Sequence, residues 1–145
     1  MSKPNNHTDL GDVLIRSDLN VPIINNEITD KFRISKSINI INSIYESSRT
    51  ITFTSHLGRP NNSDPNFSLI KIADAMSELL DNEKVMFIDA IHGAKVEEAI
   101  KNQKSKIFLL ENLRFDEGEI NNSLDFAANV TKPFQTYIFD AFGAA

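Results

Sequence analysis

The chain has 145 residues, 41% of them hydrophobic, and a formal net charge of −5. This length fits one ordinary domain, and the apolar fraction can fill a core, which argues against an intrinsically disordered chain. The acidic balance argues against a general nucleic-acid binder, which carries a basic excess.

The sequence also argues against secretion and membrane insertion. It contains no cysteine, so it holds neither a disulfide framework nor a thiolate site. Residues 1–7 are polar, unlike a signal peptide, and no apolar run approaches the ~20 residues that a membrane helix needs. We therefore expect a cytoplasmic protein with no membrane partner and no nucleic-acid partner.

Two hydrophobic periodicities alternate along the chain, one typical of buried strands and the other of amphipathic helices. Short apolar or β-branched runs predict strands at residues 13–17, 50–54, 85–88, 107–110 and 136–139. Apolar residues three and four apart predict helices over residues 35–48, 68–79, 93–101 and 123–130. Ser68 and Ser123 are the expected N-caps of the second and fourth helices.

This alternation is typical of βαβ units, which form parallel sheets with right-handed crossovers. The strands are continuous apolar runs, as expected when helices cover both faces of the sheet. We therefore expect an α/β fold with a doubly wound, Rossmann-like parallel sheet of about five strands in three layers. In such sheets ligands bind beyond the carboxyl ends of the strands, so the residues that follow each strand are the candidate site.

The first strand is followed by Asp18 and Asn20, which are two residues apart and point the same way in an extended chain. A carboxylate and an amide side by side can hold the hydroxyl and carboxylate groups of a small polar ligand. The alternative is an Asx turn before Pro22.

The second strand runs into His56, Gly58, Arg59 and Pro60. Gly58 allows a tight turn or a close approach to a ligand, and Pro60 fixes the exit of the chain. His56 and Arg59 can both donate hydrogen bonds to an anion, and the planar fork of arginine suits carboxylate or phosphate. The alternative is a solvated loop with two incidental polar residues.

Two more arginines fall near the same expected edge. Arg114 follows the fourth strand, and Arg33 precedes the first predicted helix, where a cation opposes the helix dipole and a bound anion would compensate it. Arg33 could equally be a surface residue. Asp140 follows the fifth strand and could cap a helix or orient a basic loop. Together these loops predict a binding site for a small phosphorylated or carboxylated metabolite.

Other kinds of site find little support. His92, which follows the third strand, fits a loop or cap role, and no further ligands at a familiar spacing would complete a metal site with His56. We therefore expect no metal site in this chain. The glycines form neither a dinucleotide fingerprint nor a P-loop, and a nucleotide-binding oxidoreductase would need a glycine-rich first loop.

Five motifs occur in a fixed order: RSDLNVP (residues 16–22), ITDKFRI (28–34), SHLGRP (55–60), LLENLRF (109–115) and DAFGAA (140–145). In this order and spacing the chain resembles, almost from end to end, the N-terminal, substrate-binding half of phosphoglycerate kinase. The resemblance implies a glycolytic transferase with a carboxyl group as acceptor. Such an enzyme moves a phosphoryl group between 1,3-bisphosphoglycerate and ADP, giving 3-phosphoglycerate and ATP.

The resemblance also implies roles for individual residues. Asp18 and Asn20 match the pair that holds the glycerate end of the substrate, and Arg114 matches the arginine that holds its phosphate. Arg33 matches the catalytic arginine, which contacts the transferring group and stabilises its charge. The implied substrate-binding residues are Asp18, Leu19, Asn20, Arg33, His56, Leu57, Gly58, Arg59 and Arg114.

The sequence departs from the family pattern at several positions without losing a named ligand. Ser17 stands where the family usually has valine, and Leu19 where it usually has phenylalanine. Asp116, Phe139 and Ala144 replace a common histidine, asparagine and threonine.

The extent of the resemblance sets the expected domain organisation. Residues 1–145 would be a phosphoglycerate-binding domain that is incomplete at its C-terminal end. The nucleotide domain, with its Mg²⁺ and ATP or ADP, would be absent from this chain. The full-length parent would be a monomeric enzyme, and the fragment alone would be inactive. The alternative is a stand-alone, non-catalytic small-anion-binding module.

Overall fold

The computed structural model describes residues 9–19, 23–24, 27–28, 31–55, 68–81, 83–115 and 124–140. Its strands are β1 (Gly11–Ser17), β2 (Ile23–Ile24), β3 (Glu27–Ile28), β4 (Ser48–Thr54), β5 (Val85–Ile88), β6 (Ile107–Leu110) and β7 (Thr136–Asp140). Its helices are α1 (Phe32–Ile44), α2 (Ile70–Leu79), α3 (Ala94–Lys101) and α5 (Leu124–Thr131), with a 3-10 helix at Leu113–Phe115. None of these helices is both long and apolar enough to cross a membrane.

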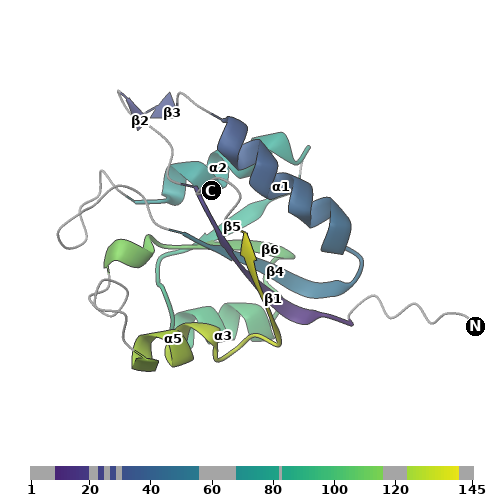
Figure 1. Ribbon diagram of the computed structural model, residues 1–145, viewed down its shortest axis with the longest axis vertical. Helices are drawn as coiled ribbons and strands as arrows, with labels where there is room; N and C mark the ends of the chain where they lie inside the picture. Colours follow the sequence, from purple (N-terminus) through teal and green to yellow (C-terminus); the bar gives the residue numbers. More distant parts are fainter. Residues whose placement is uncertain are drawn as a thin grey trace, which may run out of the picture.

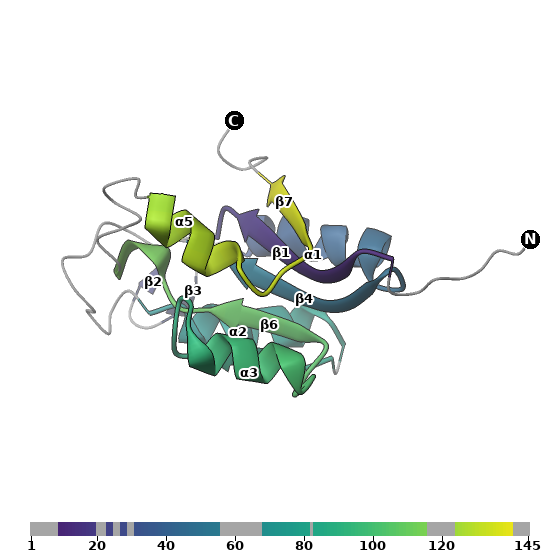
Figure 2. The same ribbon diagram turned by 90° about the horizontal axis from the view of Figure 1, so that it is seen from below.

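Five parallel strands form the central sheet, in the order β5-β6-β4-β1-β7. Helices α1 and α2 cover one face of the sheet, and α3 and α5 cover the other (Figure 1 and Figure 2). The expected α/β fold, with a five-stranded parallel sheet in three layers, is confirmed. The antiparallel ribbon formed by β2 and β3 was not predicted from the sequence.

Each face of the sheet has its own apolar core. On one face, Val13 and Ile15 of β1 pack with buried residues of α1 and α2. On the other face, Leu14 packs with buried residues of α3 and α5. Successive side chains of a strand point to opposite faces, so the middle of an inner strand such as β1 is apolar on both faces, as Val13, Leu14 and Ile15 are.

Helix α1 differs from its predicted range of 35–48 at both ends. The helix begins at Phe32, three residues before the predicted start. Phe32 is 65% exposed, so it does not belong to the buried apolar stripe from which the helix was predicted. The helix ends earlier because Ser48 is the first residue of β4. The Ser48 hydroxyl donates a hydrogen bond to the carbonyl of Ile44 at 2.7 Å, which satisfies that carbonyl in place of a further helical turn.

The predicted N-cap of the second helix is also wrong by one residue. Helix α2 has Leu69 as its N-cap, with no side-chain cap of its own. The Ser68 hydroxyl accepts a hydrogen bond from Ile70 N at 3.2 Å and donates one to Glu111 Oε2 at 2.7 Å. Leu69 N donates to Glu111 Oε1 at 2.9 Å. A carboxylate just after the end of β6 and the Ser68 hydroxyl thus share the N–H groups at the start of α2, and the helix dipole favours the negative charge there. The other predicted N-cap, Ser123, lies outside the described residues.

A polar cluster fastens the amino edge of the sheet, where the parallel strands begin. Arg49 Nη1 lies 2.9 and 3.1 Å from the two carboxylate oxygens of Asp12. The Thr50 hydroxyl donates to the same carboxylate at 2.6 Å, and Gln135 accepts from Asp12 N at 2.8 Å. The cluster therefore joins the starts of β1 and β4 to the segment that enters β7.

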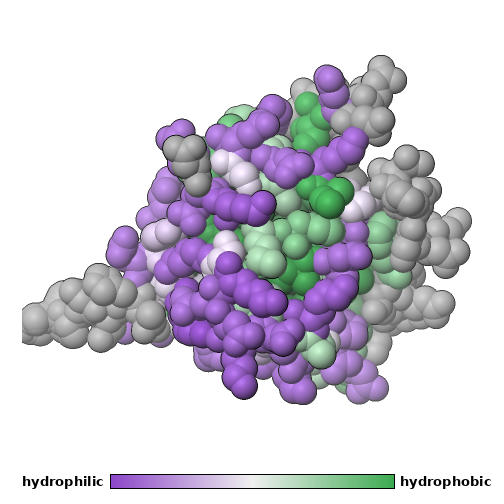
Figure 3. Space-filling view, turned by 180° about the vertical axis from the view of Figure 1, so that it is seen from behind, coloured by the Kyte–Doolittle hydropathy of each residue, from purple (hydrophilic) through white to green (hydrophobic). Residues whose placement is uncertain are grey.

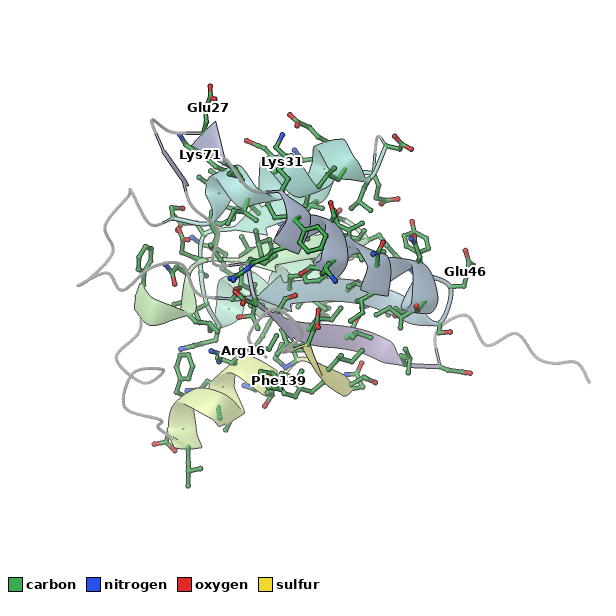
Figure 4. All side chains as sticks on the ribbon, turned by 45° about the horizontal axis from the view of Figure 1, so that its top comes forward. Arg16, Glu27, Lys31, Glu46, Lys71 and Phe139 are labelled. Atoms are coloured by element: carbon green, nitrogen blue, oxygen red, sulfur yellow. The ribbon has the colours of Figure 1, made fainter. Side chains whose placement is uncertain are left out.

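The outer strands β5 and β7 leave apolar surface exposed. On β7, Tyr137 is 51% and Phe139 is 65% exposed. Phe139 is paired with Arg16 of β1 in the ladder, and the two side chains lie close together in Figure 4. At the opposite edge, apolar surface gathers in the centre of the face seen in Figure 3, inside a polar border. Among the described residues no further strand pairs with β5 or β7 at these edges, and strand edges of this kind can pair with other chains.

We predict opposite effects on stability from two valine substitutions on β4. The buried Thr52 hydroxyl has no hydrogen-bond partner among the described residues, and its ladder neighbours are the apolar Leu14 and Phe108. Thr52→Val should therefore raise the free energy of unfolding in urea by up to about 1 kcal/mol.

The control is Thr50→Val on the same strand, which removes the hydroxyl that donates to Asp12. This variant should lower the free energy of unfolding by about 1–3 kcal/mol. A loss of stability in Thr52→Val similar to that in Thr50→Val would contradict the assignment.

Candidate functional site

The carboxyl edge of the sheet, where the parallel strands end, contains a topological switch point between β4 and β6. The chain leaves β4 towards α2 on one face, and it leaves the neighbouring β6 towards α5 on the other face (Figure 1). Loops that diverge in this way open a crevice, which is where doubly wound sheets bind their ligands. The predicted residues His56 and Arg59 follow β4, and Arg114 follows β6.

Ser55, the residue after β4, joins three of the loops at this edge. Its Oγ accepts a hydrogen bond from Leu19 N at 3.0 Å, and its carbonyl accepts one from Leu113 N at 2.9 Å. Leu19 follows Asp18, and Leu113 precedes Arg114, so each bond adjoins a predicted site residue. Ser55 is fully buried. We call these two hydrogen bonds the Ser55 junction.

The Ser55 junction also explains the position of Leu19, which the family resemblance assigns to the substrate site. Its side chain is fully buried in the core beneath α1 and α2. Its N–H is directed to Ser55. Leu19 therefore anchors the loop that carries Asp18 through packing and through its backbone.

Asp18 and Arg33 form an ion pair at the end of β1. Arg33 Nη1 lies 3.1 Å from Asp18 Oδ2 and 3.3 Å from Oδ1. The Arg33 side chain is 40% exposed and the Asp18 side chain is 14% exposed, so the pair lies at the surface of the edge. Solvent screening keeps the contribution of such a pair to stability small, and its main effect is to place the guanidinium.

The ion pair also accounts for a cation at the start of α1. Arg33 lies inside the first turn of this helix, whereas we expected it just before the helix. That turn has no acidic residue, and its N-cap Lys31 makes no side-chain cap bond. The Asp18 carboxylate supplies the negative charge that the helix start favours, so the compensation that we had assigned to a bound anion comes from the chain itself.

The structure brings only part of the predicted site into view. Asp18, Leu19 and Arg33 lie together at the end of β1, and the backbone of Arg114 lies in the 3-10 helix after β6. The Arg114 side chain lies outside the described residues, as do Asn20, His56, Leu57, Gly58 and Arg59.

Two residues that shape this edge were not predicted from the sequence. Ser55 and Glu111 occurred only as members of the motifs SHLGRP and LLENLRF. The carboxylate of Glu111 accepts hydrogen bonds from Ser68, from Leu69 N, and from Asn112 N at 2.8 Å. Burial of a serine or a glutamate at a strand end is visible only once the strands are paired.

A hollow of about 500 Å³ lies farther along the edge, beside β5. Phe87, Ile91 and Phe115 line it, and its charged residues are Asp89 and Glu111. Two carboxylates would repel an anionic ligand. Among the described residues, this hollow therefore does not match the anion site that the sequence predicts.

The described residues offer no metal centre. In the ranges that the structure covers, no three or more His, Cys, Asp or Glu side chains are grouped so that they could hold a metal ion. His92 instead packs against Phe126 of α5, with ring centroids 5.8 Å apart in an edge-to-face arrangement. This contact is in keeping with the loop role expected for His92.

Comparison with known proteins decides the family. The model of the family "Phosphoglycerate kinase" matches residues 7–145 of the chain. The chain belongs to the phosphoglycerate kinase family. The phosphoglycerate kinase of Wolbachia sp. subsp. Drosophila simulans is 42% identical over 134 residues, and that of Thermosipho africanus is 41% identical over 135 residues. Each alignment covers 92% of this chain and 33% of the relative, so the chain spans about a third of the length of these curated phosphoglycerate kinases.

Solved phosphoglycerate kinase structures share the fold. The structure from Coxiella burnetii is 30% identical with a TM-score of 0.74, and the match covers 97% of this chain and 34% of that one. The structure from Pyrococcus horikoshii OT3 is 28% identical with a TM-score of 0.77, and the match covers 94% and 35% of the two chains.

We predict that Ser55→Ala loosens the Asp18 loop. The variant leaves the buried Leu19 N–H without its acceptor, which should lower the free energy of unfolding by about 1–3 kcal/mol. Amide hydrogen exchange should become faster at Leu19 and remain unchanged at Leu113, whose acceptor is the Ser55 carbonyl.

The matched control is Ser77→Ala on α2, because Ser77 Oγ accepts a hydrogen bond from Val85 N at 2.8 Å. This variant should lose stability without faster exchange at Leu19. Equal acceleration at Leu19 and Leu113 in Ser55→Ala would count against a local role for the hydroxyl.

Proposed function

We propose that this chain is the phosphoglycerate-binding domain of a phosphoglycerate kinase, incomplete at its C-terminal end. Its ligands would be 3-phosphoglycerate and 1,3-bisphosphoglycerate, bound at the carboxyl edge of the sheet. The observation that carries the proposal is the Arg33 guanidinium, held on Asp18 at this edge in a chain of this family.

The ion pair suits a ligand that carries both a hydroxyl and an anionic group. The Asp18 carboxylate can accept a hydrogen bond from the hydroxyl of the glycerate, together with Asn20 two residues on. Arg33 offers a guanidinium, which binds carboxylate and phosphate oxygens through several N–H groups. Leu19, buried between Asp18 and Asn20, keeps the two polar residues on one short loop.

The remaining predicted residues would hold the phosphate. The proposal assigns this role to Arg114 after β6 and to the loop His56-Leu57-Gly58-Arg59 after β4. The two loops flank the switch point of the sheet, and the hydrogen bond from Leu113 N to the Ser55 carbonyl ties them together. Cations on both sides of the crevice would surround a phosphate group.

In the proposed reaction, an oxygen of the terminal phosphate of ADP bonds to the phosphorus of the acyl phosphate. The bond from that phosphorus to the carboxyl oxygen breaks, leaving the carboxylate of 3-phosphoglycerate. Arg33 stabilises the negative charge on the transferring group, since phosphoryl transfer depends mainly on positioning and electrostatics. The proposal places the nucleotide and its Mg²⁺ on polypeptide outside this chain, in a cytoplasmic, monomeric enzyme.

We predict that Arg59→Ala and Arg114→Ala each weaken the binding of 3-phosphoglycerate by about 10- to 100-fold in isothermal titration calorimetry. A charge-assisted hydrogen bond typically contributes roughly 1.5–3 kcal/mol. Lys104→Ala is the control, because it removes one exposed positive charge at the opposite end of the sheet. Unchanged affinity in both arginine variants would refute the proposed site.

We also predict that Arg33→Ala, in the full-length enzyme, lowers kcat more than it weakens substrate binding. The charge on the transferring group grows in the transition state, so an arginine that meets it there acts mainly on kcat. Equal losses in kcat and affinity would show that Arg33 only holds the bound substrate.

The 145-residue chain alone should show no ATP-dependent turnover in a coupled assay, and turnover there would contradict the assignment of ATP to another domain.

A further inference from the structure

Two buried hydroxyls face each other between the end of β1 and helix α1. Ser17 is 4% exposed and Ser37 is 2% exposed, and their Oγ atoms lie 2.7 Å apart. Ser37 is the one polar residue on the buried face of α1, whose other members are Ile34, Ile38 and Ile41. A buried hydroxyl without a partner is costly, and Ser17 is the hydrogen-bond partner of the Ser37 hydroxyl.

A nearby carboxylate determines which serine of the pair donates the hydrogen bond. Ser17 Oγ lies 3.5 Å from Asp140 Oδ2, at the long end of the hydrogen-bond range, and Ser17 is paired with Asp140 in the ladder between β1 and β7. An ionised carboxylate can only accept hydrogen bonds. Ser17 therefore donates to Asp140, and Ser37 donates to Ser17. We call these two hydrogen bonds, from Ser37 to Ser17 and from Ser17 to Asp140, the relay. The relay joins the ends of β1 and β7 to the second turn of α1.

The relay adjoins the Asp18–Arg33 ion pair in the chain. Ser17 precedes Asp18, and Ser37 follows Arg33 by one helical turn, about 6 Å along the axis. The start of α1 has no side-chain cap. The ion pair and the hydroxyl pair are thus two polar ties between the end of β1 and the first half of α1.

Apolar packing alone would fix the position and rotation of α1 on the sheet less precisely than hydrogen bonds do. Apolar contacts are non-directional, and a stripe of isoleucines tolerates a small slide or rotation of the helix on the sheet. A hydrogen bond weakens steeply when its distance or angle changes. The hydroxyl pair therefore selects one rotation of α1, and that rotation determines where the side chain of Arg33 begins.

We propose that Ser17 and Ser37 are positioning residues for Arg33, and that their buried hydroxyl pair holds the guanidinium at the ligand edge. This proposal rests on the proposed function, in which Arg33 contacts the ligand. The family pattern has valine at position 17, so the hydroxyl pair is a departure of this chain. It follows that positions 17 and 37 are coupled, and that a change at one requires a change at the other.

The test combines three variants of the 145-residue chain: Ser17→Val, Ser37→Ala and the double variant. Ser17→Val leaves the Ser37 hydroxyl without its partner, and Ser37→Ala removes the hydrogen bond that Ser17 accepts while Ser17 keeps Asp140. Each single variant should weaken 3-phosphoglycerate binding by about three- to tenfold, measured by calorimetry. The double variant should bind at least as well as the weaker single variant, because no serine is then left unmatched. Effects that multiply in the double variant would overturn the coupling, as would unchanged affinity in both single variants.

A second comparison separates positioning of Arg33 from a general loss of stability. If Ser37 acts through Arg33, then Ser37→Ala should not weaken binding further when Arg33→Ala is already present. An equal fold-change in both backgrounds would overturn the proposal. Ser48→Ala is the matched control, since Ser48 is also buried and its hydroxyl bonds the other end of the same helix. Ser48→Ala should lower the free energy of unfolding and leave the affinity for 3-phosphoglycerate unchanged.

A ligand-free measurement distinguishes failure of this proposal from failure of the proposed function. The NMR signals of the Arg33 side-chain N–H protons, assigned with Arg33→Lys, report how firmly the guanidinium is held on Asp18. Ser37→Ala should broaden or average these signals, whereas Ser48→Ala should not. If the wild-type chain does not bind 3-phosphoglycerate, the proposed function fails, and this measurement still decides the positioning role. Identical Arg33 signals in the wild type and in Ser37→Ala would overturn it.

Discussion

The arrangement of the carboxyl edge depends on one serine. Ser55 ends β4 at the point where neighbouring loops diverge, and its two hydrogen bonds hold the loops after β1 and β6 to its own. These bonds are buried, so their cost of rupture is high and the spacing of the three loops is fixed before any ligand arrives. The proposed site, built from separate loops, would thereby gain the rigidity that binding several groups of one small anion requires.

The charge of Arg33 at this edge is offset within the chain. Arg33 lies in an uncapped helix start, and the Asp18 carboxylate offsets both its charge and the helix dipole. Glu111 plays the same part for α2, where it accepts hydrogen bonds from Leu69 N and from the Ser68 hydroxyl. In an acidic protein, these carboxylates do more than lower the net charge, because each one fixes the start of a helix that borders the proposed site.

The sequence predicted the strands and helices that are marked by a run or a regular spacing of apolar residues. Strands such as Val85–Ile88 and Ile107–Leu110 were predicted to the residue, because a continuous apolar run has clear ends. The start of α1 was missed because Phe32 lies exposed outside the buried stripe. The N-cap of α2 was misplaced because the carboxylate that holds Ser68 comes from a residue 43 positions away. Such long-range polar contacts, including the Ser55 junction, leave no local pattern and become visible only when the strands are paired.

The pairing of β1 with β7 also constrains how the protein is made. Ser17 and Asp140 are partners although 123 residues separate them in sequence. During synthesis, β1 can pair with β4 early, but its other edge has no strand until residue 140 has left the ribosome. At roughly 5–20 residues per second, the growing chain therefore waits on the order of ten seconds with one side of its central strand open. In this interval we expect chaperones to bind nascent chains at the edge of β1 with which β7 later pairs.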